Sequence, residues 1–490
     1  MRQQRHERLT AVRSIRTRLN ERRCISRDVL GVYGTLVMCA RYHQDGGAPL
    51  RDQINKALKS CIVEHPVLRT VILDVESEAP KLAQQNALNL NDHICYLELN
   101  NTRGDGTQTL QALLEHAHNE PLDPWHLRPA WRLYVVPISS VAPMETTTQF
   151  HLAFTYSHAL ADGFSGMLFH KTLLRALNCP ADNAFDNGPD FECLDGIKSL
   201  LPPLENAALL PISWSFLLRP LMGEFLPSLL VRALGLSSEK SSNLWTGAQE
   251  RPNLPPSSQL LHTAVCHRLI PNLVLERALA ACRSHEARLT GLLAVMVARA
   301  LAGALYNRGI DNGEYKATLP IDLRRHVPDA QNSMANYASA TYGIVTVLQE
   351  QQQILTDRDW SMAQGLTKDL TKDSSTLVDQ PVALLKYLSN FRDWTLRQVS
   401  KPAEGSFEVS NAGAFDNAVP PSSAGWSLQD MMFSQSANAL GDPFNVNVAS
   451  TKGGPLAIVL TWWPGMLGVD DEKKLMDEVC EGLEEQLANL

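Results

Sequence analysis

The spacing of apolar residues around position 150 changes within a short stretch of chain. From Thr148 to Ser157 apolar residues alternate with polar or small ones, the period of two that predicts a strand with one buried face. Beyond Gly163 the apolar positions recur at helical spacings, from Phe164 to Leu177. Residues 158–162 are therefore predicted to form a tight connection from a strand to a helix.

Comparable patterns predict an alternation of strands and helices along both halves of the chain. In the first half we expect strands near Val32–Ala40, Thr70–Val75, Trp131–Pro137 and Phe150–Tyr156, and a helix at Leu50–Val63. In the second half we expect strands near Ala264–Ile270, Tyr315–Leu319, Thr341–Leu348, Ser427–Phe433, Phe444–Ala449 and Leu456–Trp462. The helices expected there are Leu273–Arg283, Thr290–Leu305, Val382–Arg397 and Glu472–Leu487. This succession indicates a mixed α/β protein.

The segment between the two halves, residues 178–260, is rich in proline and contains an apolar tract, Ala208–Leu236. A membrane-spanning helix needs about 20 uninterrupted apolar residues. Prolines and charged residues break this tract, so we do not expect it to span a membrane. Packing on the protein's own surface is the first interpretation, and contact with a lipid surface or cover for an apolar substrate tunnel are the alternatives.

Length and composition agree with a soluble enzyme of more than one domain. The chain has 490 residues, more than one hydrophobic core usually serves, and 44% of them are hydrophobic. Length alone suggests about two to four domains. The net charge of -8 argues against a nucleic-acid partner, which would require clustered Lys and Arg. The nine cysteines show no CxxC pair or regular spacing, so we expect free thiols and a cytoplasmic location.

One basic cluster does occur, at Arg2–Arg27. A transit peptide and a membrane-surface helix are the two functional interpretations of this composition. Glu7 and Glu21 interrupt the cluster and no long apolar run accompanies it, so we favour a solvated leading helix.

The connection after the predicted strand carries the chain's main candidate chemistry. His158 lies where the strand ends, Asp162 follows four positions later, and Gly163 comes next. A neutral imidazole can take the proton of an alcohol, while a neighbouring carboxylate fixes the turn that presents it. The competing interpretation is structural, because Asp is favoured at the start of helices and a lone His beside an apolar strand is often a buried structural residue.

Other reaction classes find no support in the chain. The sequence contains no HExxH, GxxxxGK[ST] or GxGxxG motif, and Gly163-Phe-Ser-Gly166 lacks the spacing of a serine-hydrolase elbow. His116 with His118, and His262 with His267, have no second ligand pair at zinc-site spacing. We expect no metal.

The HxxxDG pattern resembles the signature of the chloramphenicol-acetyltransferase-like superfamily, and among its members the fungal alcohol acetyltransferases look closest. The resemblance extends over nearly the whole chain in order, although each other piece is short. Those pieces are Leu30-Gly-Val-Tyr33, Ala40-Arg-Tyr42, Glu64-His-Pro-Val-Leu-Arg69, Trp131-Arg-Leu-Tyr-Val-Val-Pro137, Trp245-Thr-Gly247, Pro320-Ile-Asp-Leu-Arg324, Val409-Ser-Asn-Ala-Gly413 and Phe433-Ser-Gln-Ser436.

Two departures separate the chain from other branches of that superfamily. Condensation domains usually have a second His before the catalytic one, where this chain has Ser157. BAHD plant acyltransferases carry a DFGWG-type segment, and the nearest match here is Gly441-Asp-Pro-Phe444. The resemblance therefore favours ester formation.

The resemblance implies two chloramphenicol-acetyltransferase-like domains, each a mixed sheet flanked by helices, with the active site in a channel at their interface. The expected divisions are 1–177, a connector at 178–260, and 261–490. It also implies a monomer that binds no permanent cofactor and uses acetyl-CoA, or another acyl-CoA, as co-substrate with a small-molecule alcohol. No nucleic acid or transmembrane segment is expected, and contact with a lipid surface stays open.

The resemblance further implies roles for individual residues. His158 would be the general base, and Asp162 would pair with Arg324, with Arg325 as the fallback. Gly163 would permit close backbone approach or a positive φ. The segments holding Ser410 with Asn411, and Ser434 with Ser436, would lie near the domain interface. We rank Asn411 and Ser436 first as oxyanion donors, and hydrogen bonding to turns or neighbouring strands is the alternative for all four.

Three functions remain open at this point. The first is an acetyl-CoA-dependent O-acetyltransferase acting on a short-chain alcohol or a hydroxyl of a fungal secondary metabolite. The second is a condensation-type acyltransferase that uses a longer acyl-CoA or a carrier-bound donor. The third is a non-catalytic binding protein of the same fold, which the intact HxxxDG argues against.

Overall fold

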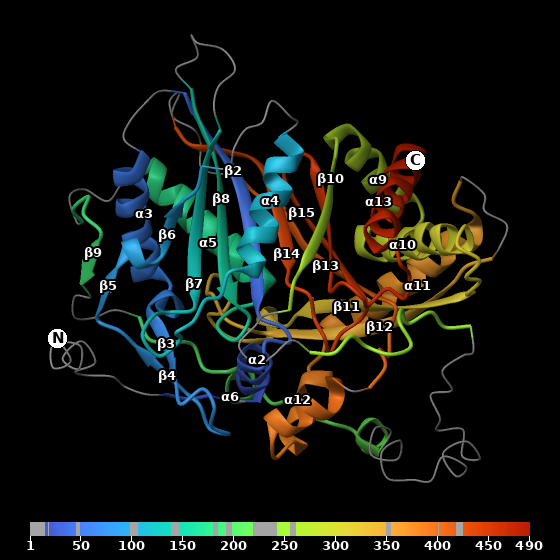
Figure 1. The fold of residues 1–490 in the computed structure, drawn as a ribbon, viewed down its shortest axis with the longest axis horizontal. Coiled ribbons are helices and arrows are strands. Elements are labelled where there is room, and N and C mark those ends of the chain that lie inside the picture. The colour runs from blue at the N-terminus through green and yellow to red at the C-terminus, as the bar shows by residue number, and fades with distance from the viewer. Residues whose placement is uncertain are drawn as a thin grey trace.

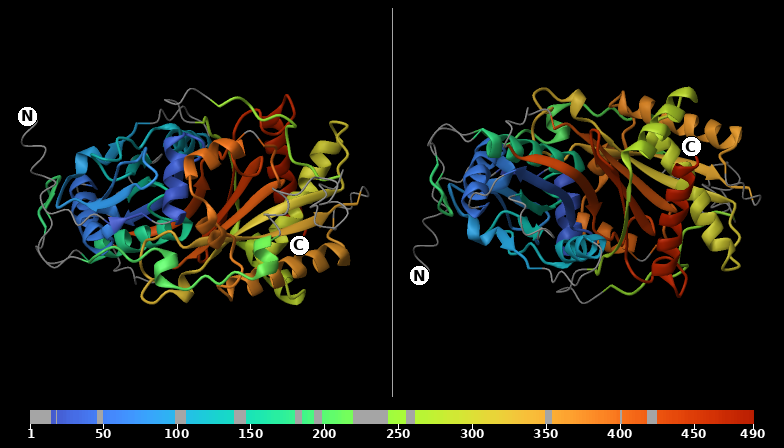
Figure 2. Two further views of the ribbon diagram at one scale, coloured as in Figure 1. Left: turned by 90° about the horizontal axis from the view of Figure 1, so that it is seen from below. Right: turned by 90° about the horizontal axis from the view of Figure 1, so that it is seen from above.

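Two large β-sheets lie side by side in the molecule, each with its own layer of helices (Figure 1). Two further views show these halves following one another along an elongated body (Figure 2). The computed structural model describes residues 15–17, 19–45, 50–98, 106–138, 147–179, 185–192, 198–218, 243–254, 261–348, 354–399, 401–417 and 425–490. The mixed α/β class predicted from the sequence is confirmed.

The first sheet has five strands in the order β14-β2-β8-β7-β6. They are β2 (Thr35–Asp45), β6 (Ile94–Tyr96), β7 (Trp131–Ile138), β8 (Thr147–Ser157) and β14 (Ser427–Gln435). Neighbouring strands are antiparallel except β6 and β7. Helices α3 (Leu50–Glu64) and α5 (Gly163–Asn178) pack on one face of this sheet, and α4 (Gly106–Asn119) packs on the other.

The second sheet has six strands in the order β10-β16-β15-β13-β11-β12. They are β10 (Ala264–Ile270), β11 (Glu314–Asp322), β12 (Ala338–Thr346), β13 (Phe407–Phe415), β15 (Phe444–Thr451) and β16 (Leu456–Trp462). Helices α9 (Asn272–Ser284), α10 (Leu289–Tyr306), α11 (Asp357–Ser374) and α13 (Glu472–Ala488) bury one face of it. The sheets meet where β14 packs against β15 and β16.

Shorter elements surround this framework. Strands β1 (Ile15–Arg16), β3 (Thr70–Leu73) and β4 (Lys81–Gln84) form a small sheet, and β5 (Ala87–Asn89) pairs with β9 (Asp190–Glu192). The 3-10 helices are η1 (Pro66–Arg69), η2 (Leu90–Asp92), η3 (Arg324–His326) and η4 (Pro381–Tyr387). Helices α2 (Leu19–Val29) and α12 (Phe391–Val399) pack against each other below the junction of the sheets, near α6 (Leu204–Ala207) (Figure 1).

The structure confirms most predicted elements and corrects one. The helix expected at Val382–Arg397 is interrupted, because η4 ends at Tyr387 and α12 begins at Phe391. The side chain of Asn390 accepts the backbone N–H of Asp393, which restarts the chain as a separate helix. The sequence analysis also missed α4, α11 and β13.

Strand β14 also departs from the predicted organisation. Its residues lie within the expected second domain, 261–490, yet they pair with β2 at the edge of the first sheet. The side chain of Phe433 accordingly packs in the first core beside Met431. The second half of the chain therefore contributes directly to the framework around residues 158–163.

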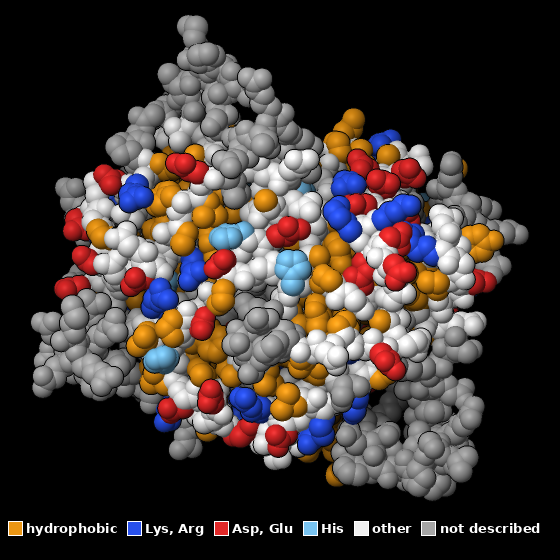
Figure 3. Space-filling view, viewed as in Figure 1, with side chains coloured by type: hydrophobic (Ala, Val, Ile, Leu, Met, Phe, Trp, Pro, Cys, Tyr) orange, Lys and Arg blue, Asp and Glu red, His pale blue; other side chains and the backbone are white. Residues whose placement is uncertain are grey.

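Helix α10 is the one described helix that has the length and hydropathy of a membrane span. Most of it is buried in the second core, where it packs against α11, α13 and β13. Apolar core helices of globular proteins have this environment. On the visible outer side of this helix layer, charged residues of both signs gather over α9 and α13 (Figure 3).

The cysteines and part of the apolar tract can be compared with their predictions. The eight cysteines in the described ranges are free, as expected. Residues 219–236 of the apolar tract lie outside the described residues. In the described part of that tract, Leu209 and Trp214 are exposed, while the backbone and hydroxyl of Ser213 hydrogen-bond to Asp379.

Candidate active site

The predicted connection from strand to helix is present, and backbone hydrogen bonds hold it at both ends. Strand β8 ends at Ser157, and the N–H of His158 donates to the carbonyl of Gly34 at 3.0 Å. Asp162 is the N-cap of α5, and its Oδ1 accepts the N–H of Ser165 at 3.2 Å. Asp162 is thus a helix N-cap, the structural role considered from the sequence. Capping uses Oδ1 alone, so it does not account for the position of the whole carboxylate.

Asp162 and Arg324 form the predicted bidentate pair. Arg324 Nη1 lies 2.7 Å from Asp162 Oδ2, and Nη2 lies 2.7 Å from Oδ1. The N–H of Tyr337 and the hydroxyl of Ser165 also donate to the carboxylate. Arg325, the fallback partner, instead contacts His326 at the surface. The pair joins the start of α5 to η3, so it links the two halves of the chain.

The electrostatics of this pair favour the ionised carboxylate. Burial by itself would raise the pKa of Asp162, but the Arg324 charge and its hydrogen bonds outweigh burial and lower that pKa. Arg324 is only 1% exposed, so its charge depends on the carboxylate and on carbonyls such as that of Ala335. The Asp162 carboxylate is therefore held in a buried ion pair with Arg324.

Gly163 is required by close packing. A Cβ at this position would lie 2.9 Å from Cζ of Phe433, a contact that real Cβ atoms do not make. Its φ is not positive, so of the two reasons considered from the sequence, close approach is the one that applies. Phe433 belongs to β14, a strand from the second half of the chain. Its ring therefore packs against the HxxxDG turn in the first half.

The hydrogen-bond contacts of the His158 ring involve one of its two nitrogens. Nδ1 lies 3.1 Å from the carbonyl oxygen of Ala161, which can only accept a hydrogen bond, and 3.2 Å from Nδ2 of Asn336, which can only donate one. The contact with Ala161 favours a proton on Nδ1, and the contact with Asn336 opposes it. Asn336 Nδ2 also donates to the carbonyl of His158 at 2.7 Å and fixes the residue from the other side. No described residue hydrogen-bonds to Nε2.

His158 is deep in the molecule and still reachable by water. Burial lowers the pKa of its imidazole to about 4, opposed by the Asp162 charge and reinforced by Arg23 and Arg27. Its side chain nevertheless keeps partial solvent exposure. The imidazole is neutral at pH 7 and available as a base.

Charged residues of α2 act on both the HxxxDG turn and the second sheet. The charges of Arg23 and Arg27 contribute to the lowered pKa of His158 and oppose the raised pKa of Glu408 in β13. Burial is the main cause of both shifts. The electrostatics of α2, the HxxxDG turn and β13 are therefore coupled.

The position of α2 corrects the interpretation of the leading basic segment. The described part of that segment is not a solvated helix, because Asn20, Cys24 and Asp28 are buried. Asn20 Nδ2 donates to the side chain of Asn336, and Asp28 accepts a hydrogen bond from the Ser157 hydroxyl. This face of α2 therefore packs on the His158 turn. Residues 1–14 lie outside the described residues.

A hydrogen-bonded chain of side chains crosses from Tyr33 to the second sheet. The Tyr33 hydroxyl donates to Oε1 of Gln435 at 2.6 Å, and Gln435 Nε2 donates to Glu408. The Tyr33 ring also packs beside His158, with centroids 5.7 Å apart. Burial raises the pKa of Glu408 to about 7, although the hydrogen bond from Gln435 lowers it. These residues form the polar wall next to the candidate base.

The candidate serines Ser434, within β14, and Ser436, directly after it, have different surroundings. The Ser436 hydroxyl accepts the N–H of Gly34 at 3.2 Å, and the carbonyl of Gly34 accepts the N–H of His158. Ser436 is therefore next to the catalytic turn, and its hydroxyl proton has no acceptor among the described residues. The Ser434 hydroxyl is hydrogen-bonded to Nε2 of His118, inside the packed interface of the sheets.

Asn411 and Ser410 lie on opposite faces of β13. The Asn411 side chain donates to Thr290 of α10 at 3.1 Å and accepts the N–H of Gly413 at 2.9 Å. Its carboxamide thus supports the helix layer and the bulge in β13, the local role kept as the alternative in the sequence analysis. Ser410 alternates with buried Val409, so it shares the face of Glu408.

Sequence reasoning missed several residues of this site. Asn336, Arg23, Arg27 and Glu408 were not singled out, and Tyr33 was quoted only as part of a motif. A helical wheel of 19–29 would have placed Asn20, Cys24 and Arg27 on one face, which is a signal against a uniformly solvated helix. No sequence signal connects Asn336 or Glu408 to His158, because their proximity depends on the pairing of distant strands.

A family model and two proteins with related sequences are described as alcohol acetyltransferases. The model of the alcohol acetyltransferase family matches residues 99–487. The probable alcohol acetyltransferase FCK4 of Fusarium pseudograminearum is 24% identical over 454 residues, which span 89% of this chain and 86% of the relative. The probable alcohol acetyltransferase crmB of Aspergillus fumigatus is 24% identical over 456 residues, spanning 89% and 90% of the two chains.

Solved structures of related shape confirm the predicted fold. The TRI3 trichothecene 15-O-acetyltransferase of Fusarium sporotrichioides aligns with a TM-score of 0.67 at 12% identity, covering 96% of this chain and 95% of that one. The first condensation domain of the CDA synthetase aligns with a TM-score of 0.56 at 14% identity, covering 97% of both chains. The chain thus has the two-domain chloramphenicol-acetyltransferase-like fold.

Proposed function

Because this chain belongs to the alcohol acetyltransferase family, we propose that it moves an acetyl group from acetyl-CoA to the hydroxyl of an alcohol, with His158 as the general base. One observation carries the proposal: an imidazole that burial keeps neutral at pH 7 and that remains partly exposed to solvent, with Nε2 free of hydrogen-bond partners in the described part of the chain. The family match supports the class of reaction, and the geometry around residue 158 supports His158 as the base.

The reaction needs no covalent acyl-enzyme, because a thioester is already activated. The alcohol oxygen gives its proton to Nε2 of His158 and bonds to the thioester carbonyl carbon, whose oxygen becomes an oxyanion. Collapse of this intermediate breaks the carbon–sulfur bond. The proton on Nε2 then passes to the departing sulfur, so the products are the ester and free CoA, and the imidazole is neutral again.

The assay that tests this proposal measures thiol release from acetyl-CoA as a function of added alcohol. A panel of short-chain alcohols and hydroxylated terpenoids or polyketides is assayed, and each product is examined by mass for the gain of one acetyl group. Thiol release that depends on the alcohol and yields an acetyl ester is the expected result. Turnover only with longer or carrier-bound acyl donors would instead support the condensation-type alternative.

Ser436 is the oxyanion donor that the geometry favours. Its hydroxyl oxygen is occupied by the N–H of Gly34, while its proton is free to donate within the described surroundings. Replacement of Ser436 by Ala is expected to lower kcat by about 10²- to 10³-fold with little change in KM for acetyl-CoA, the usual loss for one oxyanion donor. Ser434→Ala, which removes a hydroxyl bonded to His118, is the matched control. A kcat that falls equally in both variants would reject this assignment.

The acid limb of the pH profile should report His158. The base acts only when it is neutral, so activity is retained above its pKa and lost as pH falls through about 4. The lowered pKa of Asp162 keeps the pair with Arg324 ionised over the same range. We expect kcat/KM to fall near pH 4; a limb near the ordinary histidine value of about 6.5 would contradict the structure. Glu408→Gln separates any inflection caused by that carboxyl, whose pKa is about 7.

A further inference from the structure

Two buried thiols lie in contact between β10 and α13, outside the candidate active site. Cys266 belongs to β10 and Cys480 to α13, and both side chains are packed in the second core. Their sulfur atoms are 3.2 Å apart. Among the eight described cysteines, no other two sulfurs are within hydrogen-bonding distance of each other. The proposed acetyl transfer makes no use of either thiol.

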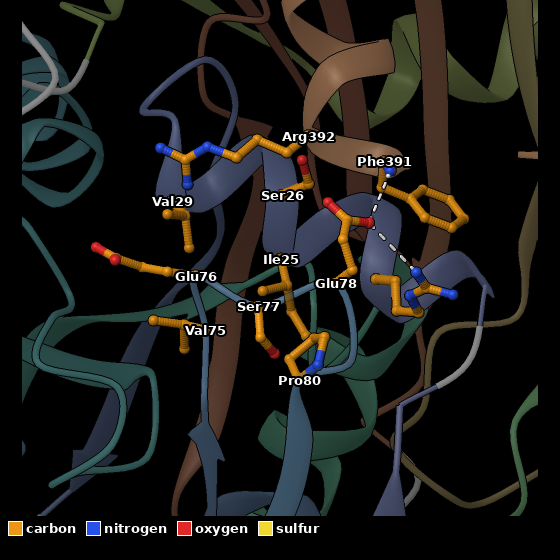
Figure 4. A pocket seen from close by; sticks show the side chains of 11 residues that line it. Ile25, Ser26, Val29, Val75, Glu76, Ser77, Glu78, Pro80, Phe391 and Arg392 are labelled. Carbon is orange, nitrogen blue, oxygen red and sulfur yellow. Dashed lines mark hydrogen bonds and ion pairs between the residues drawn. The ribbon is translucent and has the colours of Figure 1, made fainter. Parts of the chain in front are cut away.

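The contact between the two thiols is weak as an interaction, because S–H is a weak donor and sulfur a weak acceptor. The small pocket between α2 and α12 shows the contrast. There Oε2 of Glu78 accepts the guanidinium of Arg22 at 3.4 Å and the N–H of Phe391 at 3.0 Å (Figure 4). A charged acceptor strengthens both of those bonds. What distinguishes the thiol pair is therefore its chemistry and not its contribution to stability.

Asp477 of α13 defines which thiol donates to which. The hydrogen bonds from Lys473 and Cys266 outweigh burial and lower the pKa of Asp477, so its carboxylate is ionised at neutral pH and can only accept. Its Oδ1 lies 3.2 Å from the sulfur of Cys266, which means that the Cys266 proton points to Asp477. The proton between the two sulfurs therefore belongs to Cys480, and a lone pair of Cys266 faces it.

Asp477 also connects the thiol pair with solvent. Its side chain is 33% exposed, and its Oδ2 lies 2.8 Å from Nζ of Lys473 at the surface. Oδ1 of the same carboxylate contacts the sulfur of Cys266, so one contact separates that sulfur from water. Hydrogen peroxide, which is little larger than water, can approach along this edge. Bulkier oxidants are kept out, because both thiols are buried.

We infer that Cys266 and Cys480 are a site of reversible oxidation, at which a hydroperoxide converts the two thiols to a disulfide that fastens α13 to β10. The sulfur of Cys266 attacks one peroxide oxygen, the O–O bond breaks, and the departing hydroxide takes the thiol proton, which gives water and a sulfenic acid. The sulfur of Cys480 then attacks the sulfenic sulfur, the S–O bond breaks, and the Cys480 proton leaves in a second water. The two thiols lose two electrons, and the peroxide gains them.

The surroundings of the pair make this oxidation slow. The hydrogen bond with Cys480 and burial raise the pKa of Cys266, so little thiolate is present at neutral pH. Because the thiolate is the reactive form, the pair responds to sustained and not to brief exposure to peroxide. In a reducing compartment the two residues stay thiols, and a thiol reductant returns the disulfide to that state.

The first test maps the disulfides of the full chain. The protein is held in millimolar hydrogen peroxide under native conditions, the peroxide is removed with catalase, and the remaining thiols are alkylated in urea. Mass spectrometry of proteolytic peptides should find a linked pair that contains Cys266 and Cys480 and that disappears after treatment with dithiothreitol. In Cys480→Ala, Cys266 has no resolving thiol, so its sulfenic acid should be captured by dimedone.

Two outcomes of this mapping would overturn the inference. One is that both thiols are recovered alkylated while the exposed Cys179 has been oxidised. The other is that the linked pair forms only when peroxide is added to the unfolded protein in urea, because the native contact would then not be its source.

The second test asks whether the cross-link fastens α13. The disulfide joins residues far apart in the sequence and so restricts the unfolded chain strongly, and we expect the oxidised protein to melt about 5 to 15 °C above the reduced protein. The control is Cys282→Ala, which removes a buried thiol of α9 in the same core and should keep this rise, whereas Cys480→Ala should lose it. An oxidised protein that melts no higher, or a rise that persists in Cys480→Ala, would refute the fastening role. Neither test involves acetyl transfer, so both stand apart from the proposed function.

Discussion

Replacement of His158 by Ala is expected to lower kcat by about 10²- to 10⁴-fold, the usual contribution of one general base, while the fold persists. The imidazole contacts the carbonyl of Ala161 and Nδ2 of Asn336 through Nδ1, and the residue keeps partial solvent exposure. The turn is held by other contacts, namely Asp162 with Arg324 and Asn336 with the carbonyl of residue 158. Catalysis should therefore fail without unfolding.

The measurement is the rate of alcohol-dependent thiol release from acetyl-CoA, with circular dichroism melting as the test of folding. His116→Ala is the matched control, since His116 lies on α4 with 36% of its side chain exposed. Added imidazole should restore part of the lost rate, because position 158 keeps partial solvent exposure. A His158→Ala protein with undiminished turnover would remove the basis of the proposed mechanism.

The part of the site that the sequence predicts is the part encoded locally. The period of two in β8, the break at His158 and the helical period of α5 lie within one continuous segment, and the strand, turn and helix follow from them. Asp162 at the helix start is likewise a local signal. The long periodic elements were predicted to within a few residues for the same reason.

The missed elements had weaker local signals. Helix α11 has an almost entirely polar sequence with one narrow apolar stripe, and its best signal is the capping box of Thr356 and Asp359, which was not used. Strand β13 carries Asn411 and Gly413 near a bulge, and these interrupt a period of two. Local rules lose force where a bulge or a polar surface replaces regular alternation.

The missed site residues depend on long-range pairing. Glu408 can hydrogen-bond to Gln435 because β13 lies in the second sheet between β11 and β15, while β14, which carries Gln435, joins the first sheet. Neither pairing is encoded near His158. The wrong interpretation of α2 has a related cause: its arginines suggested a solvated surface, whereas the helix packs its other polar residues against the turn. Burial of polar residues is decided by partners that a linear pattern does not show.

Arg324 is the exception among these long-range partners, because the family resemblance predicted its pairing with Asp162. The geometry of the pair explains why this arginine is needed. The pair is the direct ionic link between the HxxxDG turn and the second half of the chain. It acts beside the backbone contacts of Ala335 and Tyr337. Any change that separates these groups should loosen the turn and the junction together.

Replacement of Asp162 by Asn should lower the free energy of unfolding by about 3 to 5 kcal/mol, because the buried Arg324 guanidinium then keeps only the partly exposed carboxylate of Asp322 as a charged partner. Arg324→Lys keeps the charge but loses the second hydrogen bond of the fork, so it should be destabilising to a smaller extent. Urea denaturation followed by tryptophan fluorescence measures both. In both variants kcat should fall by a larger factor than KM rises, because the position of His158 is then less precisely fixed.

The control for this pair is Asp322→Asn. Asp322 also lies 3.0 Å from Nη1 of Arg324, but its side chain is 42% exposed, so water and salt screen the interaction. Its removal should lower the free energy of unfolding by less than about 1 kcal/mol. If Asp162→Asn were no more destabilising than Asp322→Asn, the bidentate pair would not be the contact that holds the turn. The presentation of His158 would then have to depend on Asn336 and on the backbone bonds to Gly34 alone.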